Sequence, residues 1–167
     1  EFWINKDIRT WEKIIKTLES NDNVNVTNVF NNQNLGKDLS DKKGVEVFEL
    51  ETNNVLKVGV LFEKTVDVIN AGKKVNSPRI HPFTEFHWYK NEFAAVATKA
   101  KGVPLKRGEK LTLTDVEKNN LYSDLAQIEN AGLTIDISKH NNFYYNKGEG
   151  IHFIDLGAET DRKSTRL

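Results

Sequence analysis

The stretch TIDISKHNNFYYNKGEGIHFIDLG, residues 134–157, joins a polar loop to an apolar strand. Asp136 is followed five residues later by Asn141, and Asp155 ends the apolar run before Gly157. The alternation in IHFI predicts a strand that carries Asp155 to its open end, where Gly157 permits a sharp turn. Because Mg²⁺ prefers oxygen ligands, Asn141 and Asp155 are candidate metal ligands. Asp136 is then a carboxylate that can take the proton of a nucleophile.

Taken singly, these three residues are more typical of turns than of sites. Asp and Asn commonly cap turns through bonds from their side chains to the nearby backbone. Their joint spacing, rather than any one of them, favours a functional interpretation.

Composition bounds the possible classes of protein. The 167 residues, with 24 basic and 24 acidic side chains, predict one globular domain or two small lobes with a real core. The balanced charge gives no support for a nucleic-acid partner. No segment has the length of a membrane span, and no signal-peptide pattern is present. The absence of Cys excludes disulfides, thiolate nucleophiles and Cys-ligated zinc, and the absence of Met suggests a piece of a longer chain.

Hydrophobic periodicity predicts alternating strands and helices. Strands are expected over 24–30, 44–50, 54–62, 84–89 and 92–98, with turn-rich connectors at 31–44 and 51–54. Helices are expected over 8–19, 62–74 and 113–132. The second should end near Gly72, with Phe62, Val66 and Ile69 on one face.

The helix over 113–132 should be capped by Thr114 or Asp115. Its apolar stripe is predicted to consist of Val116, Leu121, Leu125 and Ile128. The order of elements predicts an α+β fold in which a sheet lobe over 1–100, with one inserted helix, meets a smaller, mostly helical lobe over 101–167.

The stretch 134–157 resembles the catalytic and metal-binding loops of the protein-kinase-like fold. That pattern is Asp-x-x-x-x-Asn followed, after a β-hairpin, by Asp-Phe-Gly or a variant. Asp136 and Asn141 match the first part, and the DLG of Asp155 to Gly157 matches the second. The resemblance implies that Asp136 is catalytic, and that Asn141 and Asp155 hold Mg²⁺ beside ATP.

Upstream segments resemble further parts of the same fold in the same order. NVLKVGV, residues 54–60, resembles the third strand, which implies that Lys57 contacts the nucleotide phosphates and takes part in catalysis. Glu63 is the nearest carboxylate that could pair with Lys57. KAKGVPL, residues 99–105, resembles the segment beyond the interlobe hinge. The remaining nucleotide-binding candidates are Thr98 and Ala100 near the hinge, and Gly36 and Gly44 around a covering loop.

Three departures from the kinase pattern are visible. Thr134-Ile135 replaces the usual His-Arg or His-Gly before the catalytic Asp. The segment KDLSDKK between Gly36 and Gly44 is too long and charged for a Gly-rich loop. Few residues follow Gly157, so the resemblance is closest to compact bacterial effector or toxin kinases with a minimal second lobe. It implies secretion or delivery into a target cell, with a cytoplasmic location as the alternative.

Three functions therefore remain open. The first is an ATP- and Mg²⁺-dependent phosphotransferase acting on a hydroxyl of a protein or another acceptor, with a cognate inhibitor or activator protein as a further partner. The second is a kinase-like module that binds a nucleotide or a partner with little turnover. The third is a small toxin nuclease that uses His140 or His152 with Asp136 or Asp155.

Overall fold

The computed structural model describes residues 26–28, 35–38, 46–50, 53–89 and 92–159. The helix predicted over 8–19 lies outside these ranges. The chain divides into two compact units: unit 1 runs to residue 70 and includes 83–99, and unit 2 consists of 71–82 and the chain from residue 100. Within the described ranges, no helix is both long and apolar enough to cross a membrane.

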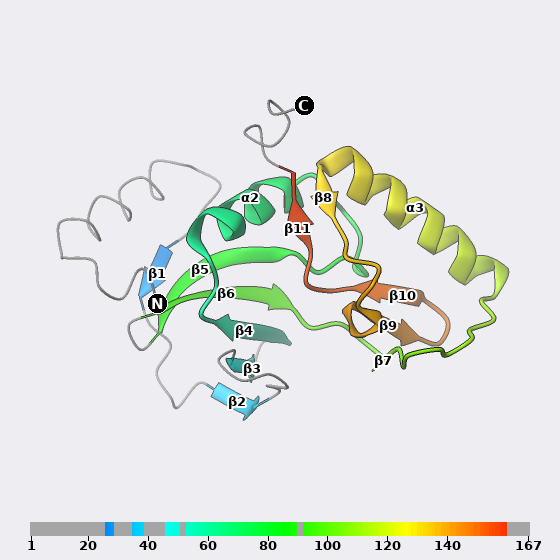
Figure 1. Cartoon of the computed structure of the whole chain (residues 1–167), viewed down its shortest axis with the longest axis horizontal. Helices are drawn as coiled ribbons and strands as arrows, with labels where there is room; N and C mark the ends of the chain where they lie inside the picture. Colours follow the sequence, from blue (N-terminus) through cyan, green and yellow to red (C-terminus); the bar gives the residue numbers. More distant parts are fainter. Residues whose placement is uncertain (1–25, 29–34, 39–45, 51–52, 90–91, 160–167) are drawn as a thin grey trace. The chain divides into compact units, whose positions relative to one another are not determined.

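Unit 1 is built on a six-stranded sheet in the order β1-β5-β6-β4-β3-β2 (Figure 1). The neighbours from β5 to β2 are antiparallel, whereas β1 runs parallel to β5. The strands are β1 (Val26–Asn28), β2 (Leu35–Asp38), β3 (Glu46–Leu50), β4 (Asn54–Val58), β5 (Phe83–Tyr89) and β6 (Glu92–Thr98). The strands predicted at 44–50, 54–62, 84–89 and 92–98 are confirmed with small differences at their ends.

The prediction of a turn-rich connector over 31–44 is wrong at β2, which lies inside it. Leu35 is in register with Leu50 of β3, and Asp38 is in register with Phe48. Pairing with an available sheet edge outweighs the local preference of this Asn- and Gly-rich segment for turns, because strand propensity depends strongly on context.

Helix α2 (Phe62–Gly72) ends where the sequence predicted. Phe62, Val66 and Ile69 pack against Phe86 and Phe93 of the sheet, which confirms the predicted apolar face. The ring centroids of Phe62 and Phe86 are 5.8 Å apart, within the range of favourable aromatic pairs. Full burial of an apolar side chain such as Ile69 or Phe86 contributes about 1.5–3 kcal/mol.

The other face of the sheet has its own apolar cluster. Successive side chains of a strand point to opposite faces. Leu56 and Val58 of β4 therefore pack with Ala94 and Val96 of β6, away from the residues that contact α2. Both faces of the central strands are buried in this way.

Unit 2 combines one long helix with short strands. Its elements are β7 (Val103–Pro104), α3 (Asp115–Ala131), β8 (Leu133–Thr134), the 3-10 turn η2 (His140–Asn142), β9 (Phe143–Asn146), β10 (Gly150–Phe153) and β11 (Gly157–Ala158). The strands form an antiparallel sheet, β10-β9-β7, and a separate pair, β11-β8. The prediction of a mostly helical second lobe is wrong for its described residues, and the coarser α+β assignment is correct.

Helix α3 begins and ends at the predicted residues. Thr114 is the N-cap and forms a reciprocal capping box with Glu117, and Gly132 ends the helix with a φ of 78°. The predicted apolar stripe is partly wrong, because Val116 is 62% exposed whereas Ile128 is buried. The buried face instead includes two acids, Glu117 and Asp124, neither of which has any exposed surface.

Each buried acid of α3 is satisfied by partners from other segments. Glu117 accepts hydrogen bonds from the Tyr145 hydroxyl at 2.7 Å and from the Gly148 amide at 2.9 Å. These bonds, together with that from the Thr114 amide, hold the pKa of Glu117 below its usual value. The hydrogen bond to Glu117 in turn raises the pKa of Tyr145. This helix face can therefore be buried although it carries charge.

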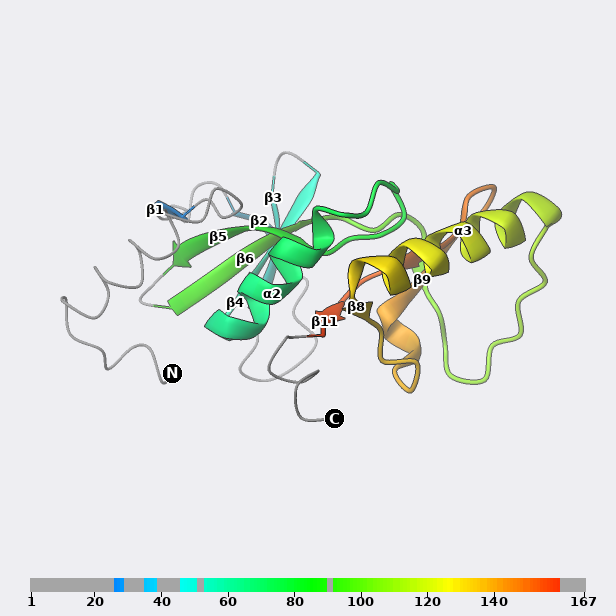
Figure 2. The same cartoon turned by 90° about the horizontal axis from the view of Figure 1, so that it is seen from above.

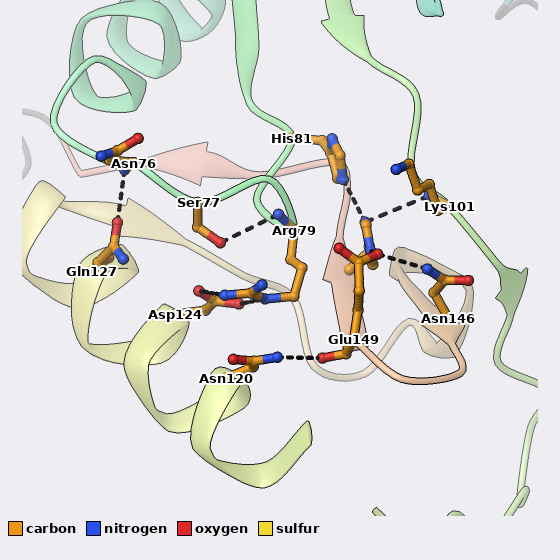
Figure 3. A network of polar contacts seen from close by, with 11 residues as sticks. Asn76, Ser77, Arg79, His81, Lys101, Asn120, Asp124, Gln127, Asn146 and Glu149 are labelled. Carbon is orange, nitrogen blue, oxygen red and sulfur yellow. Dashed lines mark hydrogen bonds and ion pairs between the residues drawn. The ribbon is translucent and has the colours of Figure 1, made fainter. Parts of the chain in front are cut away.

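Asp124 forms a bidentate ion pair with Arg79 (Figure 3). Arg79 Nε lies 2.7 Å from Oδ2, and Nη2 lies 3.1 Å from Oδ1. The carboxylate is fully buried and the Arg79 side chain is 15% exposed. The backbone of Arg79 and His81, on either side of Ile80, also bonds β10, because Phe153 N donates to Arg79 O and His81 N donates to Phe153 O. The pair thus links α3 to the segment that supports β10.

We expect Asp124→Ala to lower the free energy of unfolding by about 3–5 kcal/mol in urea denaturation. The cost arises because Arg79 would be left buried without its partner. Glu129→Ala removes an exposed carboxylate from the same helix and should change stability by less than about 0.5 kcal/mol. Similar losses for the two variants would show that the ion pair is not a principal constraint.

Candidate functional site in unit 2

The stretch 134–157 forms a closed loop in the structure. β8 and β11 pair in an antiparallel manner, with Thr134 opposite Gly157 and Leu133 opposite Ala158. Asp136 follows this pair by two residues, and Asp155 precedes it by two. The closing pair therefore brings the two acids, which are far apart in sequence, to the same end of the loop.

Asn141 is joined to this region by a second backbone contact. β9 and β10 form the predicted hairpin, with Phe143 opposite Phe153. Just beyond its open end, Ile154 N donates to Asn142 O at 3.0 Å. Asn141 and Asp155 each adjoin one partner of this bond, so the structure brings all three predicted residues into one small region.

Asp155 adopts an unusual backbone conformation, with a φ of 55°. Asp is among the few non-glycine residues that adopt the left-handed region, and such residues cluster at functional sites. The sequence analysis placed the sharp turn at Gly157, and the structure corrects this. Gly157 is needed for a different reason: a Cβ atom there would lie only 2.6 Å from Thr134 Oγ1 in the closing pair.

The Asp136 carboxylate is held by its own loop. Ser138 N donates to Asp136 Oδ1 at 3.0 Å, and Ser138 Oγ donates to the same oxygen at 2.6 Å. These bonds lower the pKa of Asp136 from its usual value, and the charge of Lys139 lowers it further. Asp136 is exposed, so this ionised carboxylate is accessible to another molecule.

The loop between Asp136 and Asn141 is anchored on the segment that follows β7. His140 Nδ1 donates to the Leu105 carbonyl at 2.8 Å, and Leu105 N donates to Phe143 O at 2.9 Å. Gly102, directly before β7, has a φ of 90°, and a Cβ atom there would collide with the backbone carbonyl of Tyr145. Figure 2 shows the chain after β7 as a light-green connection that runs to the start of α3.

The donor set fits a magnesium ion bound together with a nucleotide. Asn141 and Asp155 offer one amide oxygen and one carboxylate, and Mg²⁺ typically takes one or two carboxylates plus substrate phosphates and water. Among the described residues, no group of three or more His, Cys, Asp or Glu side chains could hold a metal alone. Asn141 and Asp155 would therefore need oxygens from phosphate and water to complete the six ligands of Mg²⁺.

The remaining predicted residues divide between the two units. Lys57, Glu63 and Thr98 belong to unit 1, whereas Ala100 belongs to unit 2 with the stretch 134–157. Gly36 lies on β2, and Gly44 lies outside the described residues. Thr98 is exposed at the end of β6, and Ala100 is buried.

Lys57 lies on the face of the sheet that α2 covers. It is half-buried on β4 and opposite Ala95, which is itself opposite Phe86. Residues directly opposite each other share a face, and Phe86 packs under α2. Glu63 is exposed in the first turn of that helix. Asp67 lies one turn after Glu63 on the same side of α2 and is half-buried. It is a second carboxylate on that side of the helix, and the sequence did not single it out.

Unit 2 also contains a buried histidine pair that the sequence did not reveal (Figure 3). His81 Nε2 lies 2.7 Å from His152 Nδ1, and His152 Nε2 lies 2.9 Å from Glu149 Oε1. The N···N distance is shorter than the roughly 3.5 Å separation of stacked rings, so the rings meet edge to edge. Asn146 Nδ2 donates to the same Glu149 oxygen, which lowers the pKa of Glu149 and keeps it ionised.

The hydrogen-bond pattern assigns the tautomers of both rings. An ionised carboxylate can only accept hydrogen bonds, so His152 Nε2 is protonated and donates the hydrogen bond to Glu149. The other nitrogen, Nδ1, then accepts from His81 Nε2–H, and Lys101 N points to it at 3.5 Å. Burial, and secondarily the neighbouring His152, lowers the pKa of His81 to about 4. His81 is therefore neutral at physiological pH.

The two histidines lie 71 residues apart, and neither HPF nor GIHF resembles a known motif for such a pair. The only sequence signal was that both occur in apolar segments predicted to lie near strands. Both rings belong to the core of unit 2, since His81 is 5% and His152 1% exposed.

The chain was compared with known families and with curated proteins. No family model matches the sequence, and no curated protein matches it.

We expect acid to destabilise the protein through His81. The pKa of His81 is about 4 in the folded protein and 6.5 in the unfolded chain. Between these two pH values the unfolded chain therefore binds more protons than the folded protein. The contribution of His81 to the free energy of unfolding is therefore fully present above about pH 6.5 and is lost as the pH falls toward 4. The loss from His81 between about pH 7.5 and pH 5 should be about 2 kcal/mol in urea denaturation.

His81→Gln, which keeps a donor toward His152, should flatten this pH dependence. His140→Gln changes a histidine bonded to the Leu105 carbonyl and serves as the matched control. An unchanged slope in His81→Gln would contradict the assignment.

Proposed function

We propose that this chain is an ATP- and Mg²⁺-dependent phosphotransferase with a protein-kinase-like fold. The observation that carries the proposal is the closed loop in which the β8–β11 pair and the bond from Ile154 N to Asn142 O gather Asp136, Asn141 and Asp155. An acceptor-orienting carboxylate beside a two-ligand metal site is the arrangement that phosphoryl transfer requires.

The surrounding fold supports this proposal. A helix, α2, is inserted between β4, which carries Lys57, and β5, in an otherwise largely antiparallel sheet. A hairpin separates Asn141 from Asp155, as in the Asp-x-x-x-x-Asn and Asp-Phe-Gly pattern. These features support a sheet lobe and a reduced second lobe of kinase type.

Each residue then has a defined role. Asp136 accepts a hydrogen bond from the acceptor hydroxyl and orients it toward the γ-phosphate. Asn141 and Asp155 hold Mg²⁺, which when bound neutralises charge on the phosphate oxygens. Lys57 contributes positive charge to the phosphates, and Glu63 orients Lys57. Catalysis consists mainly of positioning and charge stabilisation, since phosphoryl transfer needs little covalent help from the protein.

A nucleotide-binding module with little turnover is the second candidate. It is favoured by the two bonds from Ser138, which make Asp136 a turn cap whether or not it acts on an acceptor. The nuclease alternative loses one of its bases, because His152 is buried and engaged by Glu149 and His81.

The biological setting stays a prediction. A bacterial effector or toxin kinase would be secreted or delivered into a target cell, and a cognate inhibitor or activator would control it. The acceptor is a hydroxyl of a protein or of another molecule.

We expect ATP with Mg²⁺ to raise the melting temperature. A ligand that binds the folded state alone stabilises it by RT ln(1 + [L]/Kd), about 2.7 kcal/mol at a hundredfold excess over Kd. Asp155→Asn and Lys57→Ala should each reduce the shift, because one removes a metal ligand and the other a phosphate contact. Lys73→Ala changes an exposed lysine just after α2 and should leave it intact. No shift at millimolar ATP with Mg²⁺ or Mn²⁺ would refute nucleotide binding.

We expect Asp136→Asn to separate binding from turnover. The substitution keeps the shape and removes the charge, so ATP affinity should change by less than about tenfold. Transfer of labelled phosphate from ATP to lysate proteins should fall by about 10² or more, because the carboxylate acts mainly in the transition state. If Asp136→Asn keeps wild-type biological activity while Asp155→Asn loses it, the binding module is the correct function.

A further inference from the structure

The loop that contains Asp136 fixes its carboxylate through a single residue. Ser138 supplies both donors, its amide at 3.0 Å and its hydroxyl at 2.6 Å, and both reach Oδ1. Because Oδ1 is occupied by these donors, Oδ2 is the oxygen that an incoming hydroxyl would meet. The loop thus prepares one side of the carboxylate for an acceptor.

We propose that Ser138 is a positioning residue for phosphotransfer, whose hydroxyl locks the orientation of the Asp136 carboxylate and directs Oδ2 to the acceptor. This inference rests on the proposed function of the site. Ser138 touches neither the nucleotide nor the acceptor in this role, and acts through Asp136.

The second donor matters because a carboxylate rotates easily. The terminal torsion of Asp is broad, so one bond from the backbone leaves the two oxygens poorly fixed. Asp136 is exposed, and burial does not restrain it. A hydroxyl–carboxylate bond of 2.6 Å lies in the short, charge-assisted range, and it adds a second restraint on the same oxygen. Misplacement of a reacting group by about 1 Å can cost 10²-fold in rate.

The same bond keeps the carboxylate ionised. Ser138 and, to a smaller extent, Lys139 lower the pKa of Asp136. In the transfer step, the acceptor oxygen bonds to the γ-phosphorus of ATP as the bond to the ADP oxygen breaks, and the acceptor proton passes to Asp136. Because the transition state is loose, the acceptor loses its proton late, and a weakly basic but well-oriented carboxylate suffices.

This role joins two interpretations that the sequence had set against each other. Asp136 is a turn cap, and it is also the residue that meets the acceptor. The cap is the device that aims the carboxylate, so the local turn and the catalytic role support each other.

The test compares three variants with the wild type. Ser138→Ala removes the hydroxyl and keeps the amide donor, Ser138→Thr restores a hydroxyl, and Ser123→Ala removes an exposed hydroxyl from α3 as a control. Two measurements are made on the whole chain. The first is the titration of the Asp136 carboxyl carbon by NMR without nucleotide, and the second is phosphate transfer from ATP to dephosphorylated casein across pH.

In Ser138→Ala we expect the Asp136 titration to move to higher pH, because a bond that favours the ionised form is gone. The acid limb of the kcat profile should move in the same direction. At neutral pH, kcat should fall by about tenfold, while the KM for ATP changes by less than about twofold. Ser138→Thr should restore both measurements, and Ser123→Ala should match the wild type.

The outcomes separate this inference from the proposed function. If the wild type transfers phosphate and Ser138→Ala has an unchanged Asp136 titration and acid limb, the positioning role is wrong and the phosphotransferase stands. If Ser138→Thr behaves as Ser138→Ala, the hydroxyl is not the cause and the role is also wrong. If the wild type binds ATP but transfers no phosphate to casein or to lysate proteins at any pH, both proposals fail together.

Discussion

The candidate site depends on the pairing of β8 with β11. Without the pairing of Thr134 with Gly157, nothing in the backbone of this stretch would hold Asp136 close to Asp155. The pair is only two residues long on each side, so it cannot be stable alone and relies on its surroundings. Those surroundings are the β9–β10 hairpin, the bond from Ile154 to Asn142, and the end of α3, which leads directly into β8.

Unit 2 is supported by buried polar groups as much as by apolar packing. Glu117, Asp124, His81 and His152 are all buried, and each has hydrogen-bonding partners from another segment. Such networks cost much if one partner is removed, because the others are left unsatisfied in a low-dielectric region. They also define a single arrangement, since a carboxylate and a guanidinium fit only in particular geometries. A small lobe with a limited apolar core can thereby hold a loop in a fixed position.

The chain itself constrains both acids of the candidate site. Ser138 orients one carboxylate, and a left-handed backbone conformation turns the other, Asp155, out of the end of β10. Both acids remain exposed, and the loop that carries Asp136 is anchored by the bond from His140 to the Leu105 carbonyl. This combination of rigid support and accessible side chains is what a positioning mechanism needs.

The sequence by itself determined the features that neighbouring residues encode. The period of apolar residues predicted α2, β5 and β6, and Thr114, one of the two candidate caps, is the N-cap of α3. The hairpin between Asn141 and Asp155 was expected from the resemblance to the kinase-like pattern, and β9 and β10 form it. Only the tertiary structure decided which distant residues meet. Arg79 and Asp124 are 45 positions apart in the sequence, and His81 and His152 are 71 apart, and no sequence pattern indicates either pair. For the same reason Val116 is exposed where periodicity predicted a buried stripe, and β2 is a strand where composition predicted a turn. Local propensity fixes what a segment can form, whereas the partners available after packing decide which face is buried and which polar groups are satisfied.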